Sequence, residues 1–206
     1  MILYMKEKVR SFRKQMENRR SYRHFSTKYI SKEIITGLLM TASTAPSGAN
    51  KQPWLFCAVS NPDIKKKIRK EAEKIEYEAY SGKMSDEWKK DLEHLKTNWE
   101  KEFLENAPWI IVVFKKSYNI IDGQKMKNYY VNESVGLATG ILIAAIHNAG
   151  LASLTYTPSP MSFLTKILNR PENEKPYMVI PIGYPGKDAF LPEIKKKKEK
   201  EIIIFY

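Results

Sequence analysis

"VGLATGILIAAI", residues 135–146, is the most apolar run of the chain. With its flanks it predicts one long helix over 128–148, apolar nearly all round, which belongs in the centre of a hydrophobic core. The run is well short of the roughly 20 apolar residues that span a bilayer. Its "GLATG" permits close helix approach but lies inside a helix rather than at a strand-to-helix turn, so it predicts no Rossmann-type dinucleotide site. The stretch therefore favours a globular fold built around a buried helix.

Shorter apolar runs on both sides of this helix predict a sheet. Runs rich in aromatic and β-branched residues, which are typical of strands, occur at 54–60 ("WLFCAVS"), 109–115 ("WIIVVFK"), 150–156 and 177–183. Apolar spacing predicts helices at 5–18, 31–43 and near 161–168, and two charged helices at 63–80 and 86–105. Ser31 suits the N-cap of the second helix. With 206 residues and 43% hydrophobic content, one domain spanning 1–206 is expected.

The composition limits the chemistry that the chain can carry. Cys57 is the only cysteine, so neither an intramolecular disulfide nor a thiolate metal cage can form. His24, His94 and His147 lie far apart without metal-binding spacing, and no metal is predicted. The net charge of +12 suits anionic partners such as nucleic acid, acidic membrane surfaces or phosphate-bearing cofactors, or else describes an ordinary solvated basic surface.

The two ends of the sequence carry further signals. Residues 1–20 are charged throughout and lack the apolar stretch of a secretory signal, so we expect a cytoplasmic protein with no membrane segment. Residues 185–206 form a basic arm that ends in "IIIFY", which predicts a strand at 202–206 without a local partner. Such a strand is expected to pair with a sheet edge on a second subunit.

Two short motifs offer groups that suit a phosphate. "RRSYRHF" at 19–25 places three arginines and a serine at a predicted helix end, and guanidinium forks pair well with phosphate oxygens. "APSGANKQPW" at 45–54 adds a loop whose backbone N–H groups can cradle an anionic oxygen. Alone, the first is equally an ordinary basic helix end and the second a simple helix-to-strand turn. Together they are more specific than either.

With these two motifs the sequence resembles the FMN-dependent nitroreductase superfamily over nearly its whole length. "LKTNWEKEFLENAP", "NAGL", "TYTP", "NRP" and "GYP" make it similar to the iodotyrosine deiodinase branch. The resemblance implies an α+β, nitroreductase-like fold with a largely antiparallel sheet flanked by helices. It also implies a homodimer with FMN at the subunit interface and the C-terminal strand exchanged between subunits.

Carried over residue by residue, the resemblance implies an FMN site. The implied contacts to the flavin phosphate, ribityl chain and ring are Arg19, Arg20, Ser21, Tyr22, Arg23, Ser47, Thr155, Tyr156, Thr157 and Lys196. The Thr157 hydroxyl would lie near flavin N5 and favour one-electron steps, and the Ala49 amide would receive the substrate phenolate. Lys196 stands where the branch carries an arginine, which keeps the charge but loses the bidentate fork.

A third group of residues lies in the charged excursion between two predicted strands. In "KIEYEAYSG", residues 74–82, Glu76 and Tyr80 are one helical turn apart and share a face. The resemblance adds Lys101 and implies that these three bind the amino-acid end of halotyrosine. Straight helices would hold Lys101 about 20 Å from the turn, so we expect 75–100 to be a partly irregular active-site lid. The alternative is two exposed helices with incidental i,i+4 pairs.

The predicted activity is reductive dehalogenation of halotyrosine or a related halophenol, giving tyrosine and halide, with NAD(P)H or a reductase as the electron source. A broad NAD(P)H-dependent nitroreductase or quinone reductase with the same fold is the first alternative. A basic nucleic-acid-binding module is a remote one, because the basic residues accompany no recognisable DNA or RNA motif. We therefore expect no nucleic-acid partner.

Overall fold

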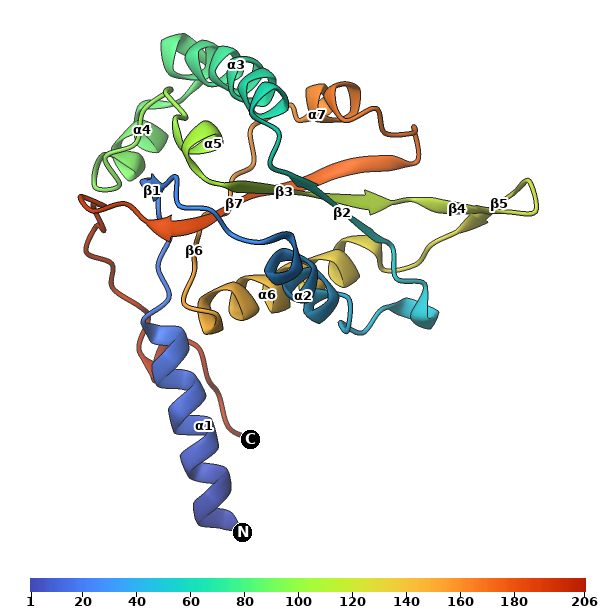
Figure 1. Cartoon of the computed structure of the whole chain (residues 1–206). Coiled ribbons are helices and arrows are strands. Elements are labelled where there is room, and N and C mark those ends of the chain that lie inside the picture. The colour runs from blue at the N-terminus through green and yellow to red at the C-terminus, as the bar shows by residue number, and fades with distance from the viewer.

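An antiparallel sheet with helices on both faces forms the body of the computed structural model, which describes residues 1–206 (Figure 1). The strands are β1 (Phe25–Ser26), β2 (Trp54–Val59), β3 (Trp109–Lys116), β6 (Ala152–Ser153) and β7 (Glu174–Pro185). Their order is β1-β7-β3-β2, with β6 also paired to β7, and every pairing is antiparallel. The predicted α+β class and largely antiparallel sheet are confirmed.

The central strand β3 explains why both faces of the sheet are covered. Side chains alternate between the faces of a strand, and residues 109–114 of β3 are all buried. Ile111 and Val113 join one hydrophobic cluster, and Ile110 and Val112 join the other. A strand that is apolar on both sides must be covered on both sides.

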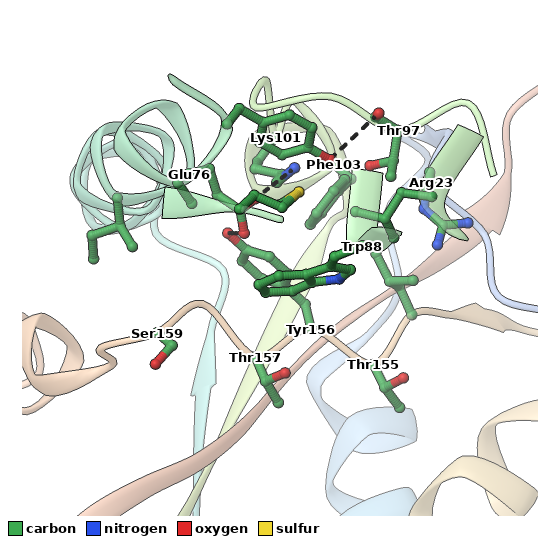
Figure 2. Close-up of a pocket in the computed structure, with 16 residues that line it drawn as sticks. Arg23, Glu76, Trp88, Thr97, Lys101, Phe103, Thr155, Tyr156, Thr157 and Ser159 are labelled. Carbon is green, nitrogen blue, oxygen red and sulfur yellow. Dashed lines mark hydrogen bonds and ion pairs between the residues drawn. The ribbon is translucent and has the colours of Figure 1, made fainter. Parts of the chain in front are cut away.

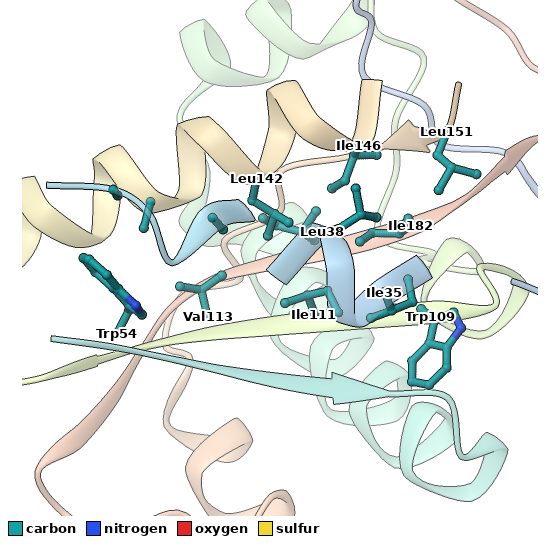
Figure 3. Close-up of a cluster of buried hydrophobic side chains, with 14 of the residues drawn as sticks. Ile35, Leu38, Trp54, Trp109, Ile111, Val113, Leu142, Ile146, Leu151 and Ile182 are labelled. Carbon is teal, nitrogen blue, oxygen red and sulfur yellow. The ribbon is translucent and has the colours of Figure 1, made fainter. Parts of the chain in front are cut away.

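On one face lie α2 (Lys32–Ala42) and α6 (Val131–Asn148), which pack against the sheet (Figure 3). The Ser31 side chain caps α2 by accepting a hydrogen bond from the Ile34 amide. Leu142 and Ile146 of α6 are fully buried. Leu137 is 52% exposed, so the prediction of a wholly central helix is wrong: α6 covers one face of the sheet and leaves an apolar outer side uncovered. No helix is both long enough and apolar enough to cross a bilayer.

On the opposite face lie α3 (Pro62–Glu78), α5 (Phe103–Asn106) and α7 (Ser162–Ile167). They enclose the second cluster, in which the helical residues Ile68, Ala72, Leu104 and Leu164 are almost completely buried. The Asn61 side chain caps α3, and Pro62 occupies its first turn, where a missing N–H costs nothing. This face carries the charged excursion that the sequence placed between two strands.

The excursion is less helical than its sequence predicted. After α3 the chain forms one wide turn, η2 (Ala79–Lys83), and then α4 (Asp86–Glu93). The second predicted helix, 86–105, stops at Glu93, and residues 94–102 are irregular. Lys96 has φ +48°, in the left-handed region that ends a helix. The irregular course that helix geometry required for Lys101 is therefore present.

Two further segments differ from their predictions. Of the predicted strand 150–156, only β6 forms a ladder, and Tyr156 adds an isolated bridge to Val179. A hairpin of β4 (Tyr118–Ile121) and β5 (Gln124–Lys127) was not predicted. Its two-residue turn is Asp122 and Gly123, both with positive φ. Asp-Gly between strands is a strong hairpin signal that was present in the sequence.

Both chain ends extend from the body. The first helix, α1 (Ile2–Glu17), has no buried residue and projects away from the sheet (Figure 1). Residues 202–206 form no strand in the single chain and are exposed, after a short turn at η3 (Glu199–Glu201). These residues join no sheet edge within one copy, and their pairing with a partner stays a prediction.

Candidate active site

A cavity of about 260 Å³ lies between the excursion and the segment that follows β6 (Figure 2). Its roof is formed by the end of α3, η2, α4 and the irregular residues after α4, and its floor by residues 154–157 and Ser159. The predicted site residues that line it are Arg23, Glu76, Tyr80, Lys101, Thr155, Tyr156 and Thr157. Met84, Trp88 and Leu92 add an apolar wall from the roof.

Glu76, Tyr80 and Lys101 meet in the roof of this cavity. The Lys101 Nζ lies 3.3 Å from Glu76 Oε2, with the two side chains 4% and 17% exposed. The same Nζ lies 5.6 Å above the centre of the Tyr80 ring. The Tyr80 hydroxyl donates to the Thr97 carbonyl at 3.5 Å. One anionic group, one cationic group and a phenol therefore line the same roof.

The surroundings shift the protonation of two of these groups. Burial lowers the pKa of Lys101, and the neighbouring Glu76 carboxylate partly opposes that effect. Burial also raises the pKa of Tyr80, and Glu76 raises it further. The phenol thus stays a neutral hydrogen-bond donor near neutral pH. A carboxylate ligand would find in Lys101 a poorly hydrated cation, for which a new anionic partner is strongly favourable.

A row of charged residues on α3 holds the chain at and after Lys101. Glu73 accepts the Lys101 backbone N–H at 2.7 Å and pairs with Arg69 at 2.7 Å. One turn earlier, Lys65 donates to the carbonyls of Glu105 and Ala107, both at 2.8 Å. Residues 65, 69, 73, 76 and 80 recur at helical spacing. This row was missed in the sequence, although its i,i+4 and i,i+3 pattern marks one face of a helix.

The floor segment alternates its side chains as an extended chain does. Thr155 and Thr157 are exposed and point to the side opposite the roof, whereas Tyr156 points up toward Glu76 (Figure 2). The Tyr156 hydroxyl donates to Glu76 Oε1 at 3.0 Å. The sequence assigned Tyr156 only as part of the flavin segment, and no local pattern signals its hydrogen bond to a residue eighty positions away.

The basic motif runs beside this floor. The Tyr22 amide donates to the Ser153 carbonyl at 3.1 Å, and Ser21 forms a bridge with Ser153. Arg20 donates to the Pro192 carbonyl, which brings the base of the C-terminal arm, four residues before Lys196, to the same region. Arg23 lines the cavity, and burial lowers its pKa.

The donor set of this motif fits a phosphate-bearing cofactor. Arg19, Arg20 and Arg23 are all half-buried, and none forms an ion pair with an acidic side chain of the chain. Half-buried guanidinium groups without anionic partners are costly unless an anion is supplied from outside. The exposed hydroxyls of Thr155 and Thr157 lie on the floor segment that Ser21 and Tyr22 adjoin through Ser153.

Two predicted residues lie elsewhere in the single chain. Ser47 and Ala49 belong to the turn η1 (Gly48–Asn50), which contacts the start of α6 through a 3.4 Å hydrogen bond from the Gly48 amide to Ser134. That turn is on the α2 and α6 side of the sheet, and the cavity is on the α3 side (Figure 1). Ala49 has φ +49°, a strained conformation for alanine that a functional loop can retain. Lys196 is exposed on the arm.

Comparisons with known proteins agree on one family. A family model described as the nitroreductase family matches residues 16–184. An iodotyrosine deiodinase of Haliscomenobacter hydrossis is 55% identical over 93% of this chain and 86% of its own length. The human iodotyrosine deiodinase 1 is 42% identical over 97% of this chain and 70% of its own length.

Solved structures give the same result for the fold. The crystal structure of an oxidized iodotyrosine deiodinase bound to FMN and 3-iodo-L-tyrosine superposes with a TM-score of 0.81 at 30% identity, covering 95% of this chain and 98% of that one. A BluB-like flavoprotein from Clostridium difficile has a TM-score of 0.73 at 23% identity, covering 94% of this chain and 98% of that chain. The second likeness concerns the fold alone.

Proposed function

This chain belongs to the nitroreductase family and, within it, to the iodotyrosine deiodinase branch, and from that membership we propose that it removes halogen reductively from halotyrosine. It is an FMN-dependent oxidoreductase. In the reaction the carbon–halogen bond becomes a carbon–hydrogen bond, two electrons and one proton are consumed, and the halogen leaves as halide. Tyrosine is the organic product.

The observation that carries the proposal is the paired carboxylate and ammonium in the roof of the cavity. Glu76 and Lys101, 3.3 Å apart, match the two charges of an amino acid. The substrate ammonium would pair with Glu76, and the substrate carboxylate with Lys101 and the Tyr80 hydroxyl. A general nitroreductase has no need of such a pair, because nitroarenes and quinones are not zwitterions.

FMN fits the basic motif and the floor of the cavity, and when bound it supplies the electrons that reduce the carbon–halogen bond. Arg19, Arg20 and Arg23 would hold its phosphate and ring, and Lys196 would add charge from the arm. Ser21, Tyr22 and Ser47 would contact it through hydroxyl and backbone groups. Thr155 and Thr157 would line its ring, with the Thr157 hydroxyl near N5, and Tyr156 would contact it through the backbone alone.

The protein's own part in the reaction is to orient the substrate and exclude water. The amino-acid clamp in the roof fixes the position of the aromatic ring. The Ala49 amide would receive the phenolate oxygen, in the manner of an oxyanion hole. Residues 75–100, with the apolar side chains of Met84 and Trp88, would act as a lid that closes over the substrate.

A homodimer would complete this site. Ser47 and Ala49 lie across the sheet from the cavity in one chain, so a single copy does not bring them to the clamp. Apolar side chains are uncovered on the outer side of α6, on α1 and in residues 202–206, and subunit interfaces bury side chains of this kind. A second copy would cover them and supply its own Ser47 and Ala49 to the cavity. NAD(P)H or a reductase as electron source, and a cytoplasmic location, stay predictions from the sequence.

The proposal is tested by single turnover. The FMN-loaded protein is reduced under anaerobic conditions and titrated with 3,5-diiodo-L-tyrosine, while flavin absorbance, tyrosine and iodide are followed. Flavin reoxidation together with release of tyrosine and iodide is the expected result. Reoxidation by nitroarenes but not by halotyrosine would establish the nitroreductase alternative instead.

The clamp has a separate test. Glu76→Gln and Lys101→Met each remove one charge while keeping the side-chain size close to the original. We expect each to weaken 3-iodo-L-tyrosine binding by tenfold or more, since a hydrogen bond to a charged group contributes about 1.5–3 kcal/mol. Glu78→Gln is the matched control, because Glu78 pairs with Lys83 on the outer surface. Unchanged affinity in both clamp variants would show that the assignment is wrong.

A further inference from the structure

The Tyr156 side chain is not explained by a flavin contact. Its neighbours Thr155 and Thr157 face one way along the floor segment, and its own ring faces the other, into the roof (Figure 2). The ring packs edge-on against Phe103, with centroids 5.4 Å apart. Its hydroxyl reaches the Glu76 carboxylate rather than any group of the floor.

The two oxygens of the Glu76 carboxylate are divided between two partners. Oε1 accepts a hydrogen bond from the Tyr156 hydroxyl at 3.0 Å, and Oε2 faces the Lys101 Nζ at 3.3 Å. These partners come from different parts of the chain, one from the floor and one from the irregular segment after α4. The plane of the carboxylate is therefore set from both sides of the cavity.

Of the two partners, Tyr156 is the one that is anchored to the sheet. Its backbone N–H and carbonyl exchange hydrogen bonds of 2.9 Å with Val179 of β7, the long strand beside the sheet centre. The contact with Phe103 fixes the ring. Lys101, in contrast, lies on an irregular segment and reaches Glu76 with a long side chain. Its Nζ also donates to the Asn98 carbonyl of the same segment.

We propose that Tyr156 is a positioning residue for substrate binding, which holds the Glu76 carboxylate at the place where the substrate ammonium arrives. The proposal rests on the proposed function, because it assumes that Glu76 receives an amino acid. When the substrate binds, Lys101 turns to the substrate carboxylate and its place at Oε2 is taken by the substrate ammonium. The hydrogen bond from Tyr156 to Oε1 persists through this exchange of partners.

The chemistry of the phenol suits this role. Burial and the neighbouring Glu76 carboxylate raise the pKa of Tyr156, so the hydroxyl remains a donor throughout the neutral range. The charged and titratable groups around it are Glu76, Glu73 and Tyr80. A donor that cannot ionise near neutral pH stabilises an anionic carboxylate without competing with the ammonium for the role of counter-ion.

The test is Tyr156→Phe in the FMN-loaded protein, with two ligands. Phenylalanine keeps the ring contact with Phe103 and the backbone bridge, and removes only the hydroxyl. Binding of 3-iodo-L-tyrosine and of 2-iodophenol, which has no amino-acid end, is measured from flavin fluorescence. We expect iodotyrosine to bind roughly ten- to a hundredfold more weakly, in line with one lost hydrogen bond to a charged group. Iodophenol affinity should change by less than about twofold, since it has no partner in the clamp.

Kinetics and a double variant separate positioning from a general structural role. KM for diiodotyrosine should rise while kcat changes little, because the hydroxyl does not touch the reacting ring. In the Glu76→Gln background, Tyr156→Phe should reduce iodotyrosine affinity by less than it does in the wild-type protein, because the two residues act as one unit. Tyr118→Phe on the β4–β5 hairpin is the control and should leave both ligands unaffected.

Three outcomes would overturn the proposal. Equal weakening of both ligands would mean that Tyr156 supports the fold of the cavity in general. Unchanged iodotyrosine affinity, or full additivity with Glu76→Gln, would mean that its hydroxyl plays no part in the clamp. A wild-type protein that binds iodophenol but not iodotyrosine would instead remove the proposed function on which this inference rests.

Discussion

The two helices of the charged excursion, α3 and α4, look alike in sequence and differ in the structure. Both begin with a side-chain cap, from Asn61 and Ser85, and both are rich in lysine and glutamate. α3 buries Lys65, Ile68 and Ala72, whereas α4 has no buried residue. Capping and composition therefore decide that a helix forms. What a helix packs against decides whether it is part of the scaffold, as α3 is, or a weakly attached element, as α4 is.

This difference assigns separate tasks to the two helices. α3 is attached to the body by the Ile68 side chain and by the two hydrogen bonds of Lys65. It can therefore hold Glu76 at a fixed height above the floor. α4 presents Trp88, which is 54% exposed, and half-buried Leu92 to the cavity, and few contacts hold it in place. Local stability is expected to fall from α3 to α4.

The first test, with the largest expected effect, compares the apolar contacts of α3 with those of α4. Ile68→Ala should lower the free energy of unfolding by about 2–5 kcal/mol, because it opens a cavity in the second cluster. Leu92→Ala, the matched change on α4, should cost less than about 1 kcal/mol and should act mainly on ligand affinity. Denaturant unfolding of both variants measures the difference. Equal losses would mean that α4 is as much part of the scaffold as α3.

The second test uses two lysines. Lys65→Met leaves the carbonyls of Glu105 and Ala107 without their donor, which should cost about 1–3 kcal/mol. Lys83→Met removes an ion pair with Glu78 whose side chains are 73% and 49% exposed, and should change stability by less than about 1 kcal/mol. The same unfolding experiment measures both. A larger loss for Lys83 than for Lys65 would contradict the account.

The third test measures how the free energy of unfolding depends on pH through Tyr156, which contacts Glu76 of α3 from the floor of the cavity. Burial raises the pKa of Tyr156, so above about pH 10 the unfolded chain releases this proton while the folded chain keeps it. The folded state then binds more protons, and this residue makes stability fall as pH rises. Tyr156→Phe should reduce that fall by up to about 1.4 kcal/mol per pH unit. Denaturation between about pH 9 and pH 11 checks it, and identical slopes for both proteins would contradict it.

The smallest expected effect concerns the contact that holds residues 94–100 against the C-terminal arm. The Lys96 Nζ lies 4.4 Å above the ring of Phe190 in the C-terminal arm, a contact of about 0.5–1 kcal/mol at an exposed site. Phe190→Leu should leave global stability almost unchanged and should speed hydrogen exchange in residues 94–100, but not in α3. Faster hydrogen exchange in α3 as well as in residues 94–100 would show that α3 and the segment after α4 do not open independently.

The elements with strong local signals were predictable, and those that depend on distant partners were not. The apolar residues of β3 and the cap at Ser31 fix their elements locally, and the resemblance supplied the fold class. The β4–β5 hairpin was missed although Asp122 and Gly123 signal it. The end of α4 at Glu93 was missed because 94–105 still has helical apolar spacing.

The candidate site likewise contains residues that local spacing predicts and residues that only the whole fold brings together. The sequence brought Glu76 and Tyr80 to one helix face by spacing alone, and the family resemblance added Lys101. The hydrogen bond from Tyr156 to Glu76 joins residues eighty positions apart, and no periodic pattern encodes such a contact. The position of Ser47 and Ala49 across the sheet from the cavity also depends on the whole fold. Under the proposed function, a second copy of the chain would bring Ser47 and Ala49 to the site.

The most direct measurement of the central claim is a crystal structure of the FMN-loaded protein with 3-iodo-L-tyrosine bound. The account predicts the substrate ammonium at about 3 Å from Glu76 and the substrate carboxylate at about 3 Å from Lys101. It also predicts α4 closed over the ring, and Tyr156 still bonded to Glu76. A bound substrate whose charged end lies in solvent, with Glu76 and Lys101 still paired to each other, would contradict it.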